Sequence, residues 1–227
     1  MGSTLQGFLG FGYGIVAMSV LAVTVGVVPA SGVVNITGAI QVMWMAWALR
    51  QHIRWSYMLR LLPGIGAGLG LGLLTLKHAD PTLLIRALGA TIVGIAVWNL
   101  YAPHGRGHGS PLWDFLIGFS SGAIGGAFNT GGPPIVAYLY RRPDPPEVLK
   151  ATVQITFVVF TTVRLCSATA LGLIDGEILR LALWLAPSVI AGAVAGLAIG
   201  RRVPAERFRT ASWVALGLLG IGLALRA

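Results

Sequence analysis

The residues best suited to bind an anion form one short run, Asn129-Thr130-Gly131-Gly132-Pro133-Pro134, inside an apolar stretch at positions 116–140. Two glycines followed by two prolines do not continue a helix. Proline is favoured in a first helical turn, however, and asparagine or threonine caps such a turn well. The pattern therefore predicts that one helix ends here and a second begins. The free N–H groups and partial positive charge of the new N-terminus would attract an anion. A proline-kinked helix or a buried loop is the alternative.

Few other polar residues lie inside the apolar segments, so those that do are candidates for an anion cavity. Asn35 lies in segment 33–49 and Gln154 in segment 148–173, at equivalent places in two similar stretches. Their amides can donate to an anion without the desolvation cost of a full charge. Thr37 lies about 200° around a helix from Asn35, so both cannot point the same way. We predict that Asn35 and Gln154 face the cavity, with hydrogen bonding between helices as the alternative.

Arg164 is the one charged residue deep in a predicted membrane crossing. An arginine inside a membrane suggests a functional role, here attracting an anionic substrate or gating its route. Alternatively, its long side chain reaches the outer interface, because Glu147 at the other end of the segment lies about seventeen residues of helical rise away.

The remaining chemistry-bearing residues argue against an enzyme. The seven acidic residues lie at or beyond segment ends and the four histidines lie in loops. The sequence has no metal-ligand spacing within a segment, no serine–histidine pair, no HExxH motif and no Walker motif. We therefore expect no catalytic residue, no metal and no cofactor. The sequence also offers no buried carboxylate as a proton or sodium relay.

These residues are positioned by membrane helices. The chain is 56% hydrophobic and 10% charged, whereas a soluble domain carries roughly 25% charged residues. About 20 apolar residues span a bilayer, and the apolar segments are 5–28, 33–49, 57–76, 82–101, 112–140, 148–173, 178–200 and 208–225. The sequence thus predicts an all-α polytopic membrane protein. The net charge of +9 suits anionic lipid headgroups, and no basic-aromatic surface suggests nucleic acid.

The chain repeats itself. Val34-Asn35-Ile36-Thr37 is echoed by Val153-Gln154-Ile155-Thr156, and Ile15-Val16-Ala17 by Ile135-Val136-Ala137, just after a glycine-rich break in each case. These matches predict a duplication into an N-terminal repeat at 1–103 and a C-terminal repeat at 112–227, joined by a loop at 104–111. Duplicated halves with breaks at equivalent places indicate a transporter's binding site. Coincidence among apolar, glycine-rich segments is the alternative.

Glycines crowd two of the segments at spacings that allow close helix packing. They are Gly64, Gly66, Gly68, Gly70 and Gly72 in one segment, and Gly192, Gly196 and Gly200 in another. We predict a packing role for them, with a pore-lining role as the minor alternative.

The distribution of Lys and Arg indicates the topology. If all eight segments cross the membrane, nine lie on one face and six on the other. If the first and fifth segments are re-entrant hairpins, eleven lie on one face, leaving Lys77, Arg86, Arg180 and Arg226 on the other. The second arrangement fits better and gives each half a hairpin plus three crossings. The halves are then inverted repeats, both termini lie outside the cytoplasm, and the hairpin tips meet near the midplane.

Three motifs together resemble the TauE/SafE sulfite-exporter family over essentially the whole chain. They are Gly7-Phe8-Leu9-Gly10-Phe11-Gly12-Tyr13-Gly14, Arg50-Gln51-His52-Ile53-Arg54-Trp55 and Gly125-Gly126-Ala127-Phe128-Asn129-Thr130-Gly131-Gly132-Pro133-Pro134. The resemblance implies a bacterial inner-membrane carrier for small sulfur-containing anions such as sulfite, sulfoacetate or related organosulfonates. The Gly-Tyr-Gly and Thr-Gly-Gly-Pro-Pro breaks depart from the family's commoner Gly-Gly-Gly run, which leaves the particular substrate open.

The implied mechanism is export by alternating access, with the two tips cradling an oxyanion. An inside-negative potential drives anion exit by about 2.3 kcal/mol per charge per 100 mV, so no coupling cation is needed. An anion-selective channel and a non-transporting assembly protein are the alternatives, and a homodimer is compatible but not required. The predicted substrate-binding residues are Gly10, Gly12, Tyr13, Gly14, Asn35, Asn129, Thr130, Gly131, Gly132, Pro133, Gln154 and Arg164.

Overall fold

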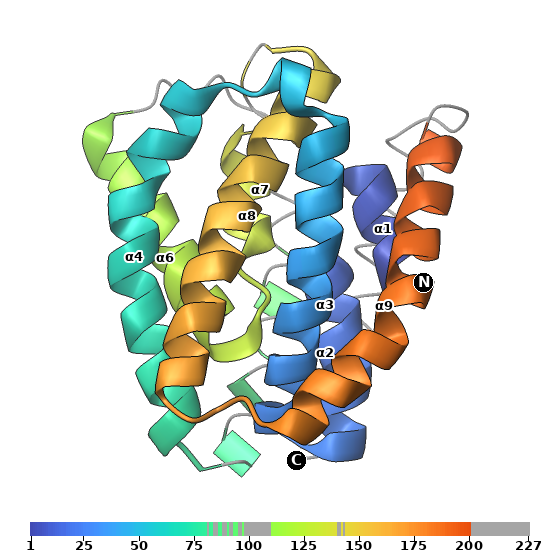
Figure 1. Ribbon diagram of the computed structural model, residues 1–227. Helices are drawn as coiled ribbons and strands as arrows, with labels where there is room; N and C mark the ends of the chain where they lie inside the picture. The colour runs from blue at the N-terminus through green and yellow to red at the C-terminus, as the bar shows by residue number, and fades with distance from the viewer. Residues whose placement is uncertain are drawn as a thin grey trace.

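The computed structural model describes residues 1–80, 110–139, 142 and 144–200, together with scattered positions between 82 and 97. Within these residues every regular element is a helix (Figure 1). The elements are α1 (Gly2–Leu9), α2 (Tyr13–Val25), α3 (Val27–Ala48), η1 (Arg50–His52), α4 (Trp55–His78), α6 (Pro111–Phe128), α7 (Gly132–Leu139), α8 (Pro146–Ala170) and α9 (Gly176–Gly200). Most of the predicted segment 82–101 and all of 208–225 lie outside the described residues, as do several of the charges that entered the topology count.

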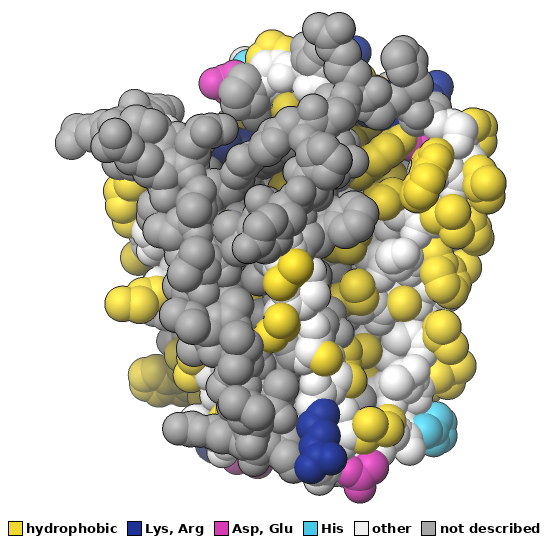
Figure 2. Space-filling model, turned by 180° about the vertical axis from the view of Figure 1, so that it is seen from behind, with side chains coloured by type: hydrophobic (Ala, Val, Ile, Leu, Met, Phe, Trp, Pro, Cys, Tyr) yellow, Lys and Arg dark blue, Asp and Glu magenta, His cyan; other side chains and the backbone are white. Residues whose placement is uncertain are grey.

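Four helices, α3, α4, α8 and α9, are long and apolar enough to cross a membrane. On the face shown in Figure 2, the visible charged side chains lie at the two ends of the molecule, and hydrophobic side chains cover much of the described surface between them. Leu71 of α4 and Trp184 of α9 are among the exposed apolar side chains, which suits contact with lipid rather than water. The chain is therefore an all-helical, multi-pass membrane protein.

Both predicted helix breaks are present, and each ends its first helix in the same way. Gly10 follows α1 with φ 83°, and Asn129 follows α6 with φ 55°. This left-handed conformation favours glycine or asparagine. It lets the Gly10 N–H donate to the Gln6 carbonyl at 2.7 Å and the Asn129 N–H to the Gly125 carbonyl at 2.8 Å. The breaks are shorter than predicted, because Tyr13 and Gly132 already begin the next helices.

The glycine-rich face of α4 packs directly on α6. A Cβ built at Gly64, Gly68 or Gly72 would overlap a backbone carbonyl oxygen of α6, and one built at Gly118, Gly122 or Gly126 would press on the backbone of α4. The reciprocal contact means that the two backbones touch without side chains between them. The predicted packing role is therefore confirmed for Gly64, Gly68 and Gly72. It is not confirmed for Gly66 and Gly70, since nothing described lies within 4 Å of a Cβ built there.

This contact yields a stability prediction with an internal control. Gly68→Ala is expected to lower the free energy of unfolding by about 1–3 kcal/mol, the usual cost of overpacking, because α4 and α6 must separate. Gly66→Ala should leave stability unchanged or slightly higher, since nothing described lies within 4 Å of its new methyl group and alanine favours helix. Thermal unfolding of the detergent-purified variants measures both. Equal behaviour of the two variants would contradict the close packing.

The same kind of contact joins α1 and α9. A Cβ at Gly7 would overlap the Ala193 carbonyl oxygen, and one at Gly196 would overlap the Thr4 carbonyl oxygen. Meanwhile α3 and α8 pack side by side in the centre of the bundle, between α4 and α9 (Figure 1). Thus the first helix of each predicted repeat (α1 or α6) packs on the second long helix of the other (α9 or α4). The central pair, α3 and α8, takes one helix from each predicted repeat.

Candidate anion-binding site

The two helix breaks touch each other. A Cβ built at Gly14, in the first turn of α2, would overlap the backbone oxygen of Asn129. One built at Gly132, the first residue of α7, would lie 3.5 Å from Cβ of Phe11. Only glycine at position 14 allows this approach of backbone to backbone. Segments far apart in the sequence, one from each predicted repeat, therefore meet at one place.

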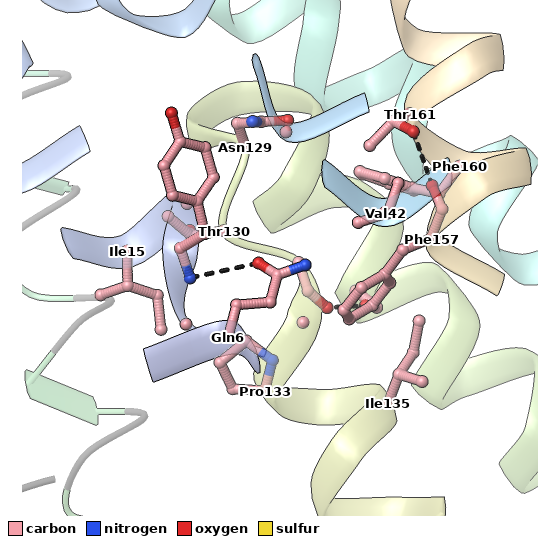
Figure 3. Close-up of a pocket in the computed structure, with 17 residues that line it drawn as sticks. Gln6, Ile15, Val42, Asn129, Thr130, Pro133, Ile135, Phe157, Phe160 and Thr161 are labelled. Carbon is pink, nitrogen blue, oxygen red and sulfur yellow. Dashed lines mark hydrogen bonds between the residues drawn. The ribbon is translucent and has the colours of Figure 1, made fainter. Parts of the chain in front are cut away.

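A cavity of about 50 Å³ lies where the breaks meet (Figure 3). One water needs roughly 10–15 Å³ by this measure, so the cavity has room for a few waters or one small oxyanion. Its walls come from both breaks and from α1, α3, α6 and α8. The predicted residues that line it are Gly12, Tyr13, Gly14, Asn129, Thr130, Gly131, Gly132 and Pro133. Four other predicted residues do not line it, namely Gly10, Asn35, Gln154 and Arg164.

The cavity combines neutral polar groups with aromatic rings. Among its lining residues there is no charged side chain, and Phe157 and Phe160 of α8 form an apolar wall. Positive potential must therefore come from the N-termini of α2 and α7, whose first N–H groups have no partner within their own helices. Two prolines in the first turn of α7 remove donors there, so Gly131 and Gly132 supply its free N–H groups.

Two polar side chains at the second break lack partners among the described residues. The hydroxyl oxygen of Thr130, whose side chain is 2% exposed, and the amide oxygen of Asn129 are both buried without a hydrogen bond. An unsatisfied buried polar group is costly, and native proteins rarely leave one without a water or ligand. Both residues line the cavity, so a polar guest would be held on this side of it. Toward an anion the side-chain donors here are the Thr130 hydroxyl and the Asn129 Nδ2, since an amide oxygen only accepts.

At the first break, the side-chain amides of Gln6 and Gln154 bond the backbone polar groups. Gln154 Nε2 donates to the Gly10 carbonyl at 2.6 Å, and its Oε1 accepts from Gln6 Nε2 at 3.5 Å. Gln6 Oε1 in turn accepts the N–H of Tyr13 at 3.3 Å. Gln154 therefore holds the break from α8 instead of facing the cavity. Of these two glutamines, only Gln6 lines the cavity, and it was not among the residues predicted from the sequence.

The predicted equivalence of Asn35 and Gln154 does not extend to their contacts. Asn35 is fully buried on α3, and neither atom of its amide has a partner among the described residues. It lies one turn before Gly38, which does line the cavity. Thr37 accepts a bond from the Tyr13 hydroxyl at 2.6 Å, because its own proton is given to the Val33 carbonyl at 2.7 Å. Thus Thr37 supports the first break, although the sequence analysis preferred Asn35.

Arg164 is fully buried and does not extend to the interface, so the snorkelling alternative is wrong. Its Nε donates to the carbonyls of Gly125 at 2.9 Å and Gly126 at 3.2 Å, and its Nη2 donates to Gly126 at 3.0 Å and to the hydroxyl of Ser31. These carbonyls end α6, where the helix dipole is negative. The guanidinium therefore clamps the end of α6 at the break and ties it to α3.

A second polar cluster ties the end of α7 to the starts of α4 and α6. Asp114, in the first turn of α6, accepts from the Tyr138 hydroxyl and lies 3.9 Å from Arg142, whose guanidinium covers the rings of Tyr57 and Tyr138. Tyr57 donates to Asp144 at 2.8 Å. The sequence predicts Asp114 at a segment end and no buried carboxylate. The residue is at that end, but its side chain is buried.

No group of three or more His, Cys, Asp or Glu side chains in the described part of the chain is placed to hold a metal ion. What the arrangement can do is bind a small anion by neutral donors and helix termini, inside a bundle built to lie in a membrane.

Comparison with known proteins agrees with this chemistry. The model of the family "Sulfite exporter TauE/SafE" matches residues 1–223. A "Probable sulfite/organosulfonate exporter TauE" of Cupriavidus necator is 30% identical over 99% of this chain and 89% of its own length. A "Probable inner membrane transporter protein TsaS" of Comamonas testosteroni is 28% identical over 76% of this chain and 73% of its own. No solved structure matches the chain. With its family model matched over nearly the whole sequence, the chain belongs to the TauE/SafE sulfite exporter family.

Proposed function

We propose that this protein exports small sulfur-containing anions, such as sulfite, sulfoacetate or related organosulfonates, across the inner membrane, and that it has no enzymatic activity. The observation that carries the proposal is the single cavity shared by two broken helices, one from each repeat. The names of the two relatives, an exporter of sulfite and organosulfonates and an inner-membrane transporter, support the substrate class and the location.

The substrate anion is held by the N–H groups at the starts of α2 and α7, with Asn129 and Thr130 adding side-chain contacts. None of the described residues that line the cavity is charged. Neutral donors suit a carrier, because an anion held without an opposite charge is released more easily. Asn35, whose two amide atoms have no partner in the described part of the chain and which lies one turn from the cavity, joins this set when the helices shift. Gln154 and Arg164 do not contact the anion; they fix the backbone of the first and second break, respectively, and so position the donors that do.

Alternating access follows from two inverted halves that rock against each other. The directions of the helices support this relation. The N–H of Arg54, beyond the end of α3, bonds Thr152 near the start of α8 at 3.1 Å, and Gly32 near the start of α3 lies against Ile178 beyond the end of α8. The central helices therefore run in opposite directions. Tyr138 reaches back to Asp114, so α7 returns along α6 as a re-entrant hairpin does.

The cluster around Asp114 and Tyr57 closes one end of this path. Arg54 pairs with Asp144 at 3.0 Å, which joins the loop before α4 to the loop before α8. Rocking of one half would separate these groups. In the topology with two re-entrant hairpins this end faces the cytoplasm and both termini lie outside it.

Ligand-dependent thermal stabilisation of the purified protein tests the substrate class. A panel of sulfite, thiosulfate, sulfate, sulfoacetate, taurine and chloride is compared at equal ionic strength. A sulfur oxyanion or sulfonate that binds only the folded state should raise the free energy of unfolding by about 2.7 kcal/mol at 100 times its Kd, whereas chloride should not. A protein that responds to none of these anions would contradict the proposal.

Flux into liposomes then tests the mechanism with the anion that stabilises best. A carrier that alternates between two states gives a rate that saturates with substrate concentration. A rate that rises in proportion to concentration without saturating would instead indicate an anion-selective channel through the same breaks.

A further inference from the structure

The two breaks differ in one respect that the sequence repeat does not predict. In the first break a side chain of the protein itself, that of Gln6, bonds an N–H at the start of α2. The position that corresponds to Gln6 in the second repeat is Gly125, whose missing side chain leaves space that the ring of Phe160 fills. Among the residues that the structure describes, the second break therefore has no such side-chain partner for an N–H, and its Thr130 hydroxyl is unpaired.

Gln6 is placed as an occupant of the anion site. Its side chain is 4% exposed and lines the cavity, and Figure 3 shows its amide among the other lining residues with its bond to the Tyr13 N–H. Tyr13 is the first residue of α2, so this N–H is one of those that an anion would seek. The carboxamide oxygen of Gln6 accepts this N–H, as one oxygen of a bound oxyanion would.

The bonds of Gln6 are also the weak ones of the network. They measure 3.3 Å to the Tyr13 N–H and 3.5 Å to Gln154, both longer than the usual 2.9–3.0 Å for N–H···O. Gln154, by contrast, holds the Gly10 carbonyl at 2.6 Å. Gln154 is therefore a fixed support of the break, whereas Gln6 is held loosely enough to leave.

We propose that the carboxamide of Gln6 is a displaceable internal ligand of the substrate site. It satisfies the start of α2 while the site is empty, and the transported anion replaces it and adds the bonds that Thr130 and Asn129 offer. The inference rests on the proposed function, because it assigns the first contact of the same anion. Gln6 then sets the affinity, and its departure accompanies each binding event.

Two substitutions of Gln6 have opposite expected effects. Gln6→Met keeps the size of the side chain but removes its oxygen, so the N–H of Tyr13 is free for the anion. We expect sulfite to bind about two- to tenfold more tightly, the range that one neutral hydrogen bond corresponds to. Gln6→Glu keeps the acceptor and adds negative charge, which holds the N-terminus of α2 and repels the anion. Its Kd for sulfite should rise at least about tenfold.

Gln41→Met is the matched control. Gln41 is also a buried glutamine that bonds α1, through the Ser3 carbonyl at 3.1 Å, but it does not line the cavity. This variant should lose some stability and keep the wild-type Kd, measured from the concentration dependence of the thermal shift and from liposome flux.

The outcomes separate the two proposals. If wild-type protein binds sulfite but Gln6→Met binds it equally or more weakly, Gln6 is a structural support and the inference is overturned. Unchanged affinity in Gln6→Glu overturns it as well, even if Gln6→Met does not fold. If neither wild type nor Gln6→Met binds any anion of the panel, the proposed function fails and the inference fails with it. Binding by Gln6→Met but not by wild-type protein would show that Gln6 occupies the site without being displaced by the anions tested, which overturns the inference.

Discussion

Gly14→Ala is expected to weaken anion binding about 100-fold and to block transport. The new methyl group would overlap the backbone oxygen of Asn129, and neither backbone can yield without moving its helix. The two breaks must then separate, which displaces the N–H groups of α2 from Asn129 and Thr130. A misplacement of about 1 Å costs on the order of 100-fold in other sites, and we expect a loss of that size in affinity for sulfite. The free energy of unfolding should fall by about 1–3 kcal/mol.

Gly38→Ala is the control for this experiment, because Gly38 lines the same cavity. Its new Cβ would lie 3.6 Å from the ring of Tyr13 and 3.8 Å from the amide nitrogen of Asn129, which is ordinary contact. Affinity should change by less than about threefold, since the donors keep their places. Thermal shift with sulfite and liposome flux measure both variants. Wild-type affinity in folded Gly14→Ala would show that the contact between the breaks has no part in binding.

Arg164→Met is expected to stop transport by loosening the end of α6. Without the guanidinium, the carbonyl of Gly126 loses two donors and that of Gly125 loses one. An orphaned buried acceptor costs about 1–3 kcal/mol, so the variant should be less stable as well as inactive. Arg164→Lys restores the charge but not the planar fork that reaches several acceptors, and it should recover stability better than transport.

The stability of the Arg164 variants decides between two roles. A residue that binds substrate would leave the empty protein stable and weaken only the response to sulfite, whereas a clamp lowers the unfolding temperature before any ligand is added. Arg60→Met is the control, because Arg60 lies on the exposed side of α4. Arg164→Met with normal stability and normal flux would refute the clamp.

The sequence could predict the helix breaks because they depend on local chemistry. Glycine allows positive φ and is a poor helix former, and proline fixes φ and lacks an N–H, whatever surrounds them. The ends of α1 and α6 and the starts of α2 and α7 therefore follow from a few neighbouring residues. The crossing helices follow equally from hydrophobic length, as α3, α4, α8 and α9 show. The spacing of the glycines on α4 likewise predicted a packing face, although not its partner.

Most of the predicted residues at the breaks line the cavity and those on the long helices do not, for a physical reason. A side chain on a long helix has several faces to point toward, and its bonds depend on helices that come from distant sequence. Asn35 and Gln154 look alike in the repeat, yet one amide is bonded to the Gly10 carbonyl and the other is unpaired. Asp114 looks like a solvated end residue until the return of α7 brings Tyr138 to it.

By itself, then, the sequence determined the membrane class and the positions of the breaks, since both follow from short-range preferences and composition. Only the tertiary structure decided that the breaks touch through Gly14, that Gln6 occupies the start of α2, and that Arg164 clamps α6 from α8. These are contacts between residues far apart in the chain, and they are set by which helices pack together.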